Sequence, residues 1–184
     1  MTHSFDNHTM ETAPEASRPL MQNAIDAFGM LPNLIAKMAT SPTMTEAYLT
    51  MGDIFSRSSL SAVEQQVVLL TVSRFHNCSY CVGAHSAIAD MQEIPEDITN
   101  AIRDNRDIND EKLHILRVFT EHVLDQRAWV DNAILQSFYD VGYTQENVLD
   151  VIVGIAMKTL SNYTNHIAGT ELDEAFSHRD WNQS

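Results

Sequence analysis

Two cysteines and a histidine that lie close together are the residues with the most evident chemistry in this sequence. Cys78 and Cys81 are the only cysteines, and His85 follows Cys81 by one helical turn. On a continuous helix these side chains lie at about 0°, 300° and 340°, so they share one narrow face. A thiolate is a nucleophile, a helix N-terminus stabilises an anion, and an imidazole can take the thiol proton. Because neighbouring thiols can close a disulfide after one is oxidised, the spacing favours thiol redox chemistry.

Metal binding is the main alternative for this segment. His76 precedes the cysteines, and the pattern H-x-C-x-x-C-x-x-x-H could supply two cysteines and two histidines to zinc. On an unbroken helix His76 would lie at about 160°, away from the other three, so only a break near Asn77 could bring it round. Four ligands in so short a segment are also cramped. Redox chemistry is therefore preferred over zinc and over an inert pair in the core, and neither a metal nor a cofactor is expected.

The composition excludes several classes of partner. The chain has 184 residues, with 11 Lys and Arg against 25 Asp and Glu, and a formal net charge of −14. Nucleic acid and anionic membrane surfaces are not expected partners, because phosphate groups are bound by clustered cations. No stretch approaches the ~18 apolar residues of a membrane span, and the N-terminus lacks the features of a secretory signal. A single-domain cytoplasmic protein is expected.

Helical periodicity runs through most of the chain, and no segment alternates in the way that strands joined by hairpins do. Ser61 and Glu64 match the capping box that begins a helix. The expected helices span residues 19–28, 32–38, 43–55, 61–76, 78–91, 95–103, 110–127, 133–139 and 145–167. The fold class is therefore all-α, with the long helix at 145–167 expected at its centre.

The domain organisation follows from the same pattern. Residues 1–18 are polar and aperiodic, which predicts a flexible N-terminal arm. Residues 19–176 form the expected helical domain, and residues 177–184 a polar tail.

Two segments resemble one known superfamily. LSAVEQQVVLLTVSRFHNCSYCVGAH resembles the core of the carboxymuconolactone decarboxylase and alkylhydroperoxidase D superfamily, and AMKTLSNYTNHIAGTELDEAF is similar to the C-terminal part of its uncharacterised peroxidase-related branch. The resemblance implies a single-domain helical bundle of the alkylhydroperoxidase D-like type that assembles as a homo-oligomer, a trimer or a hexamer. It also implies an antioxidant activity, in which a thiol pair reduces peroxides and an external dithiol or protein reductant resets the pair.

Carried over by position, the resemblance makes Cys81 the thiol that attacks peroxide, Cys78 the thiol that resolves the sulfenic acid, and His85 the proton carrier. One helical turn lets Cys81 and His85 touch, which makes this order physically reasonable. Two positions depart from the family pattern: the relay glutamate is Gln66 here, and the histidine between the cysteines is Tyr80. Because the relay then has no carboxylate, slow peroxidase turnover is expected.

Glu64, Tyr80 and His166 are secondary site candidates. Glu64 lies about 200° from Gln66 on a helix and already has a role in the capping box. His166 follows Asn162 by one turn, so the two side chains can touch. Two other functions stay open: a binding or structural protein with a vestigial or zinc-bound thiol pair, and a carboxymuconolactone decarboxylase. The second is disfavoured because decarboxylation gives two cysteines no obvious role.

Overall fold

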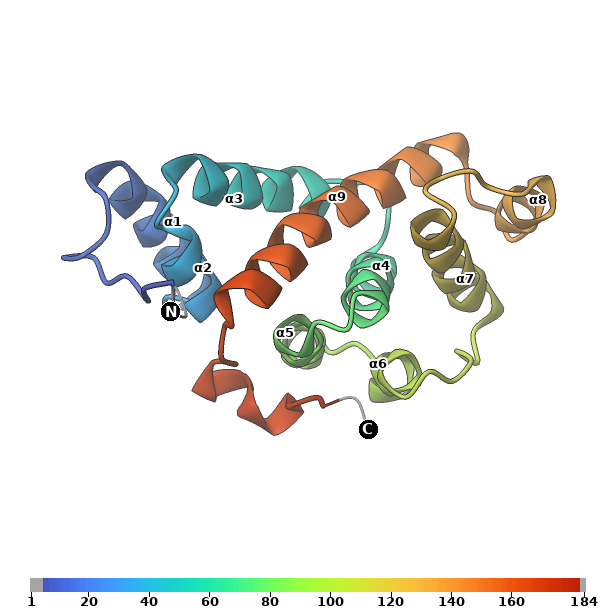
Figure 1. The fold of residues 1–184 in the computed structure, drawn as a ribbon. Coiled ribbons are helices and arrows are strands. Elements are labelled where there is room, and N and C mark those ends of the chain that lie inside the picture. The colour runs from blue at the N-terminus through green and yellow to red at the C-terminus, as the bar shows by residue number, and fades with distance from the viewer. Residues whose placement is uncertain (1–4, 183–184) are drawn as a thin grey trace.

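The computed structural model describes residues 5–182, which form helices and no strands (Figure 1). The outer ends of the expected arm and tail, residues 1–4 and 183–184, lie outside this range. The helices are α1 (Arg18–Phe28), α2 (Asn33–Met38), α3 (Pro42–Ser56), α4 (Ala62–Phe75), α5 (Ser79–Met91), α6 (Glu96–Arg103), α7 (Glu111–Asp125), α8 (Asn132–Asp140) and α9 (Gln145–Ala168), with two short 3-10 helices, η1 (Glu15–Ser17) and η2 (Glu174–Arg179). The all-α prediction is confirmed.

Helix ends follow local signals in the sequence. Gly29 and Gly169 end α1 and α9 in the left-handed conformation, with φ of 73° and 59°, which glycine adopts without steric cost. Ser61 begins α4 with the expected capping box. Asn77, with φ of 57°, separates α4 from α5, so the predicted break is confirmed. Cys78 thereby becomes the residue that caps the N-terminus of α5.

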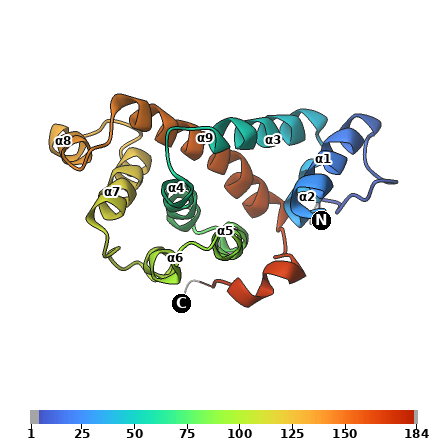
Figure 2. The ribbon, with the colours of Figure 1, turned by 180° about the vertical axis from the view of Figure 1, so that it is seen from behind.

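The centre of the bundle is α4. It packs against α5, α6, α7 and α9, and Figures 1 and 2 show these helices around it. The long α9 crosses the bundle on one side of α4, and several of its large apolar side chains are exposed. The expectation that α9 is the central buried helix is therefore wrong, because its apolar residues cover more of the helix surface than its neighbours bury.

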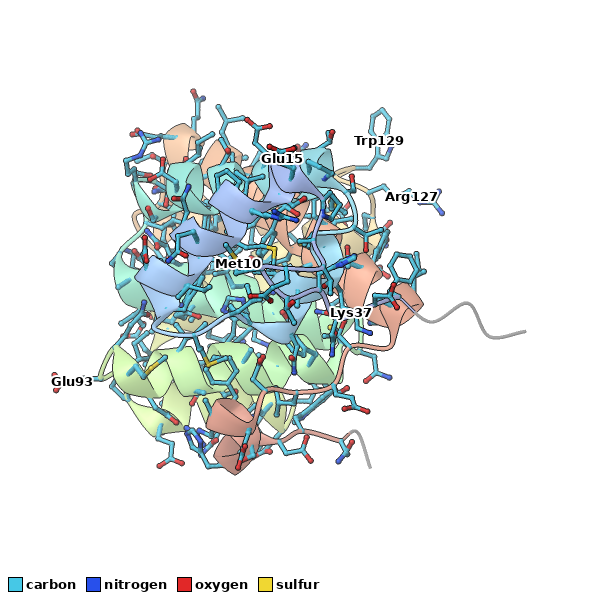
Figure 3. The ribbon with its side chains drawn as sticks, turned by 90° about the vertical axis from the view of Figure 1, so that its left-hand side faces the viewer. Met10, Glu15, Lys37, Glu93, Arg127 and Trp129 are labelled. Atoms are coloured by element: carbon cyan, nitrogen blue, oxygen red, sulfur yellow. The ribbon has the colours of Figure 1, made fainter. Side chains whose placement is uncertain are left out.

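Two hydrophobic clusters fill the interior. The larger one joins α4, α6, α7, α8 and α9. The second contains Cys78 and Cys81 together with apolar residues of α1 and α2, and Met10 packs against it (Figure 3). The thiols therefore lie where the N-terminal helices meet the rest of the bundle.

The packed part of the chain extends beyond both expected domain boundaries. Ser17 is fully buried, and its Oγ donates a hydrogen bond to the carbonyl of Ala39 at 2.7 Å. At the other end Trp181 is buried, and its Nε1 donates to the carbonyl of Arg103 at 3.2 Å. The boundaries of the 19–176 domain thus need correction, since single anchoring side chains leave no periodic pattern in the sequence.

Gly154 allows α9 to approach α3 and α4 closely. A Cβ at this position would lie 2.9 Å from side-chain atoms of both Phe55 and Val68, closer than van der Waals contact. We expect Gly154→Ala to lower the free energy of unfolding by about 1–3 kcal/mol, measured by urea denaturation. Gly52→Ala is the matched control, because its Cβ would meet only Met157, at 3.5 Å, an ordinary contact. Equal losses of stability in the two variants would contradict the close-packing role.

Candidate functional site

The two thiols are buried where α5 begins. Cys78 is the N-cap residue and Cys81 lies in the first turn; each is 1% exposed, and neither is in a disulfide. Cys81 forms part of the wall of a cavity of about 590 Å³, whereas Cys78 is not among the residues that line it. A molecule in the cavity can therefore reach Cys81 first.

Side chains from α9 face the two sulfurs. The Nδ2 of Asn165 donates to Cys81 Sγ at 3.1 Å and lies 3.8 Å from Cys78 Sγ. The Oγ of Ser161 is 4.0 Å from Cys81 Sγ. Asn162 is near enough to Cys81 to help lower the pKa of its thiol. Cys81 is thus surrounded by groups that can donate to a negatively charged sulfur.

His76 orients the Asn162 amide. Its Nδ1 donates to Asn162 Oδ1 at 3.0 Å, and among the described residues the Nδ2 of the amide has no hydrogen-bond partner of its own. His76 lies at the C-cap of α4, just before the break at Asn77. The histidine weighed as a zinc ligand therefore contacts an amide of α9.

The surroundings shift the pKa values of the two thiols in opposite directions. Burial raises the pKa of Cys81, but a hydrogen bond from Cys78, the charge of Lys158 and the Asn165 amide outweigh it and lower the pKa to about 5. The hydrogen bond to Cys81, together with burial, raises the pKa of Cys78. At neutral pH Cys81 is therefore the thiolate, and Cys78 keeps its proton.

His85 and Gln66 make the contact that their positions predicted. The Nδ1 of His85 lies 3.1 Å from Gln66 Oε1, while Gln66 Nε2 donates to Gln92 Oε1 at 3.2 Å. Since an amide oxygen only accepts, the ring carries its proton on Nδ1 and Nε2 is bare. Burial and the charge of Lys158 hold the pKa of His85 well below its usual range. His85 is therefore a neutral imidazole in this site.

Two of the secondary candidates lie away from the site. The carboxylate of Glu64 accepts hydrogen bonds from Ser61 and pairs with Lys112 at 2.9 Å, so it serves the start of α4. His166 is exposed on the outer side of α9. Its partner in the predicted pair, Asn162, is buried and bonds His76 instead.

Tyr80 forms part of the cavity wall. Its hydroxyl donates to Asp173 Oδ2 at 2.6 Å and accepts a hydrogen bond from the backbone N–H of Leu34. Asp173 also accepts the N–H of Asn33 at the start of α2. Burial and the Asp173 carboxylate raise the pKa of Tyr80, so its hydroxyl stays protonated. This side chain therefore joins α5, α2 and the C-terminal segment beside the cysteines.

The four side chains of the possible zinc set do not converge. His76 bonds Asn162 and His85 bonds Gln66, so their rings face different partners. Across residues 5–182, no group of three or more His, Cys, Asp or Glu side chains has the arrangement of a metal site.

The part of the chain that the structure describes contains no helix with the length and apolar character needed to cross a membrane.

The polar side chains of α9 were not identified as site residues from the sequence. Lys158, Ser161, Asn162 and Asn165 recur at intervals of three and four, so they share one face of a largely apolar helix. All four are buried. A buried polar row of this kind is the signal that could have identified them.

The cavity beside Cys81 has mostly apolar walls. They come largely from the N-terminal helices and include Leu20, Ala24, Ala27, Phe28, Leu34 and Ile35. On the side of the thiol the wall contains Cys81, His85, Tyr48 and Lys158. The site therefore combines a space for an apolar molecule with a reactive sulfur at one end.

Comparisons with known proteins agree with the all-α fold. The model of the carboxymuconolactone decarboxylase family matches residues 42–112. No curated protein gives a significant match. Among solved structures, an uncharacterized peroxidase-related protein with the alkylhydroperoxidase AhpD core, from Ralstonia eutropha JMP134, aligns with a TM-score of 0.84 and 22% identity, over 96% of this chain and 95% of that chain. A second uncharacterized peroxidase-related protein, from Silicibacter sp. TM1040, aligns with a TM-score of 0.79 and 15% identity, over 94% and 93%.

A debrominase has the same architecture. A cysteine-to-alanine variant of Bmp8, in complex with 2,3,4-tribromopyrrole, aligns with a TM-score of 0.80 and 17% identity, over 97% of this chain and 96% of that chain. At such identities the structural matches establish the fold. The chain therefore has the alkylhydroperoxidase D-like all-α fold, and its segment 42–112 matches the model of the carboxymuconolactone decarboxylase family.

Proposed function

We propose that this protein is a thiol-dependent oxidoreductase that reduces organic hydroperoxides. The observation that carries the proposal is the pairing of Cys81, a thiolate on the cavity wall, with Cys78, a protonated thiol beside it. An attacking thiolate and a neighbouring resolving thiol are the two groups that such a cycle needs.

The reaction divides into three steps. The Cys81 thiolate attacks one peroxide oxygen, the O–O bond breaks, and the products are a Cys81 sulfenic acid and an alkoxide that takes up a proton. Cys78 then attacks the Cys81 sulfur, and water leaves as the disulfide forms. An external dithiol or protein reductant returns two electrons and two protons, which restores both cysteines.

The cavity supports an organic substrate. Its volume of about 590 Å³ is in the range of pockets that hold small organic ligands. Apolar side chains such as Ala24, Ala27 and Phe28 would contact the organic group, while the peroxide reaches Cys81. Hydrogen peroxide would leave most of this apolar surface without a contact.

Reductive dehalogenation is the second candidate, favoured by the fold shared with the debrominase Bmp8. The Cys78–Cys81 pair of this chain could supply the two electrons of that reaction as well. In that reaction the Cys81 sulfur takes the halogen, the substrate carbon takes a proton, and Cys78 displaces halide to form the disulfide. Both reactions use two electrons from the cysteines and end in the same oxidised protein. Their products therefore distinguish them.

The test compares three oxidants on the fully reduced protein: cumene hydroperoxide, hydrogen peroxide and 2,3,4-tribromopyrrole. We expect disulfide formation with cumene hydroperoxide, faster than with hydrogen peroxide and matched by one equivalent of cumyl alcohol. Bromide release from the bromopyrrole without reaction of either peroxide would favour the second candidate. Oxidation by all three at the rate of free cysteine would contradict both.

We also propose that the protein is a homo-oligomer, a trimer or a hexamer. Large apolar side chains lie exposed along one side of α9, namely Leu149, Ile152, Tyr163 and Ile167. Light scattering is expected to give a mass well above the 20.7 kDa of one chain, and Ile167→Glu should lower it. Trp129→Glu is the control, because Trp129 lies in the loop between α7 and α8 and projects from the surface (Figure 3). A monomer at micromolar concentration would contradict the proposal.

A further inference from the structure

We infer that Lys158 is the counter-ion of the Cys81 thiolate, a buried positive charge that α9 places on the cavity wall to keep this sulfur ionised. The inference concerns the ionisation of Cys81, so it applies whichever oxidant reacts with the thiolate.

The burial of Lys158 calls for a negative partner. Its side chain is 1% exposed, and a buried ammonium group is costly unless an opposite charge or hydrogen bonds compensate it. Within residues 5–182 no carboxylate lies within 4.0 Å of its Nζ, since every ion pair found there involves other cations. The partner of Lys158 is therefore a group other than a nearby Asp or Glu.

The titratable groups that share the cavity with Lys158 show which of them can be its negatively charged partner. From α3, Glu46 and Asp53 are exposed, and Asp53 pairs with Arg57 at 3.0 Å. Tyr48, also from α3, stays a neutral phenol, since burial and the charge of Cys81 raise its pKa.

On the side of α5, the groups facing the cavity are Cys81, His85 and Tyr80. His85 is neutral and Tyr80 is a protonated phenol. The Cys81 sulfur is thus the buried group in this wall that can carry the compensating negative charge.

The helical register supports the same pairing. Lys158, Asn162 and Asn165 lie at i, i+4 and i+7, so α9 directs them to one side. Asn165 donates to Cys81 at 3.1 Å and Asn162 helps to lower the pKa of the same thiol, but neither asparagine carries a charge. The dipole of α5 adds a fractional positive charge at the first turn. Lys158 is therefore the full positive charge in this arrangement.

The experiment measures the pH dependence of Cys81 alkylation by iodoacetamide, with the modified cysteine assigned by peptide mass spectrometry. Removing a cation destabilises the thiolate, so Lys158→Met should move the midpoint of the profile upward by about 1–3 pH units. For a shift of about two units, the rate at about pH 6 falls about tenfold. Lys158→Arg, which keeps the charge, should return the midpoint toward that of the natural protein.

Lys112→Met is the matched control, because it removes the same charge from a lysine that pairs with Glu64 outside the cavity. Its midpoint should not move. A folded Lys158→Met variant with an unchanged midpoint would overturn the inference. If that variant does not fold, the natural protein still decides, since a midpoint at the ordinary thiol value of about 8.5 would overturn it as well. A low midpoint without any reaction with hydroperoxide would reject the proposed activity and leave this inference standing.

Discussion

Replacing Cys81 by serine is expected to abolish oxidation of the protein by cumene hydroperoxide. The cavity reaches Cys81, and the pKa of this thiol, lowered to about 5, makes it the thiolate at neutral pH. The Cys78 thiol that remains is buried and lies outside the cavity lining, so it should not react in place of Cys81. The measurement is mass spectrometry of peptides after treatment with hydroperoxide and a reagent that traps sulfenic acid.

The Cys78→Ser variant tests the order of the two thiols. It should still react once with hydroperoxide. The sulfenic acid should then be trapped on Cys81, because no second thiol remains to convert it into a disulfide. No disulfide should form, and turnover with a dithiol reductant should fall far below that of the natural protein. A trapped sulfenic acid on Cys78 in the Cys81→Ser variant would reverse the assignment.

Gln66→Glu is expected to increase peroxidase turnover by about 10²-fold, at the lower end of the usual contribution of general acid–base catalysis. The first chemical step releases an alkoxide that needs a proton, and neutral His85 has none on its Nε2. A carboxylate in contact with Nδ1 raises the pKa of His85 and favours the imidazolium, which can donate that proton. The rate should then fall as the pH rises through the raised pKa, because the imidazolium is lost above it.

Two further variants show whether this gain passes through His85. Glu64→Gln should leave the rate unchanged, since Glu64 serves the capping box and the pair with Lys112. His85→Asn combined with Gln66→Glu should lose the gain. If Glu64→Gln slows oxidation and Gln66→Glu has no effect, the working carboxylate is Glu64 and the relay runs through another path.

The structure indicates that the positive charge beside Cys81 comes from Lys158 rather than from His85. The sequence suggested that His85 takes up the thiol proton. It also suggested that peroxidase turnover is slow because the relay lacks a carboxylate. The pKa of His85 is instead lowered by burial and by Lys158, so the lysine supplies the positive charge near the sulfur. The absence of a carboxylate at Gln66 therefore affects proton supply to the leaving group more than thiolate formation.

Features set by local interactions could be predicted from the sequence. Helix ends at Gly29 and Gly169 and the break at Asn77 depend on conformations that a few neighbouring residues decide. The contact of Gln66 with His85 could be predicted because a known family pattern supplied the pairing of two helices. The fold class followed from the periodicity that all these helices share.

The α9 half of the site could not be predicted in the same way. Lys158 and Asn165 come about 80 residues after the cysteines, and only the packing of α9 against α4 and α5 brings them to the sulfur. Their spacing shows that they share a face, but it does not show which helix they meet. These residues also lie outside the 42–112 segment that the family model matches.

The cavity beside Cys81 is built from two sets of helices with different tasks. The sulfur, the histidine and the lysine are held by α5 and α9, while most of the apolar wall comes from α1, α2 and α3. Reactivity and selectivity therefore reside in separate parts of the chain. Substitutions in α1, where Ala24 and Ala27 leave room in the cavity, can alter which molecules fit while the ionisation of Cys81 stays the same. A protein built in this way can acquire a new substrate through its N-terminal helices and keep its redox centre.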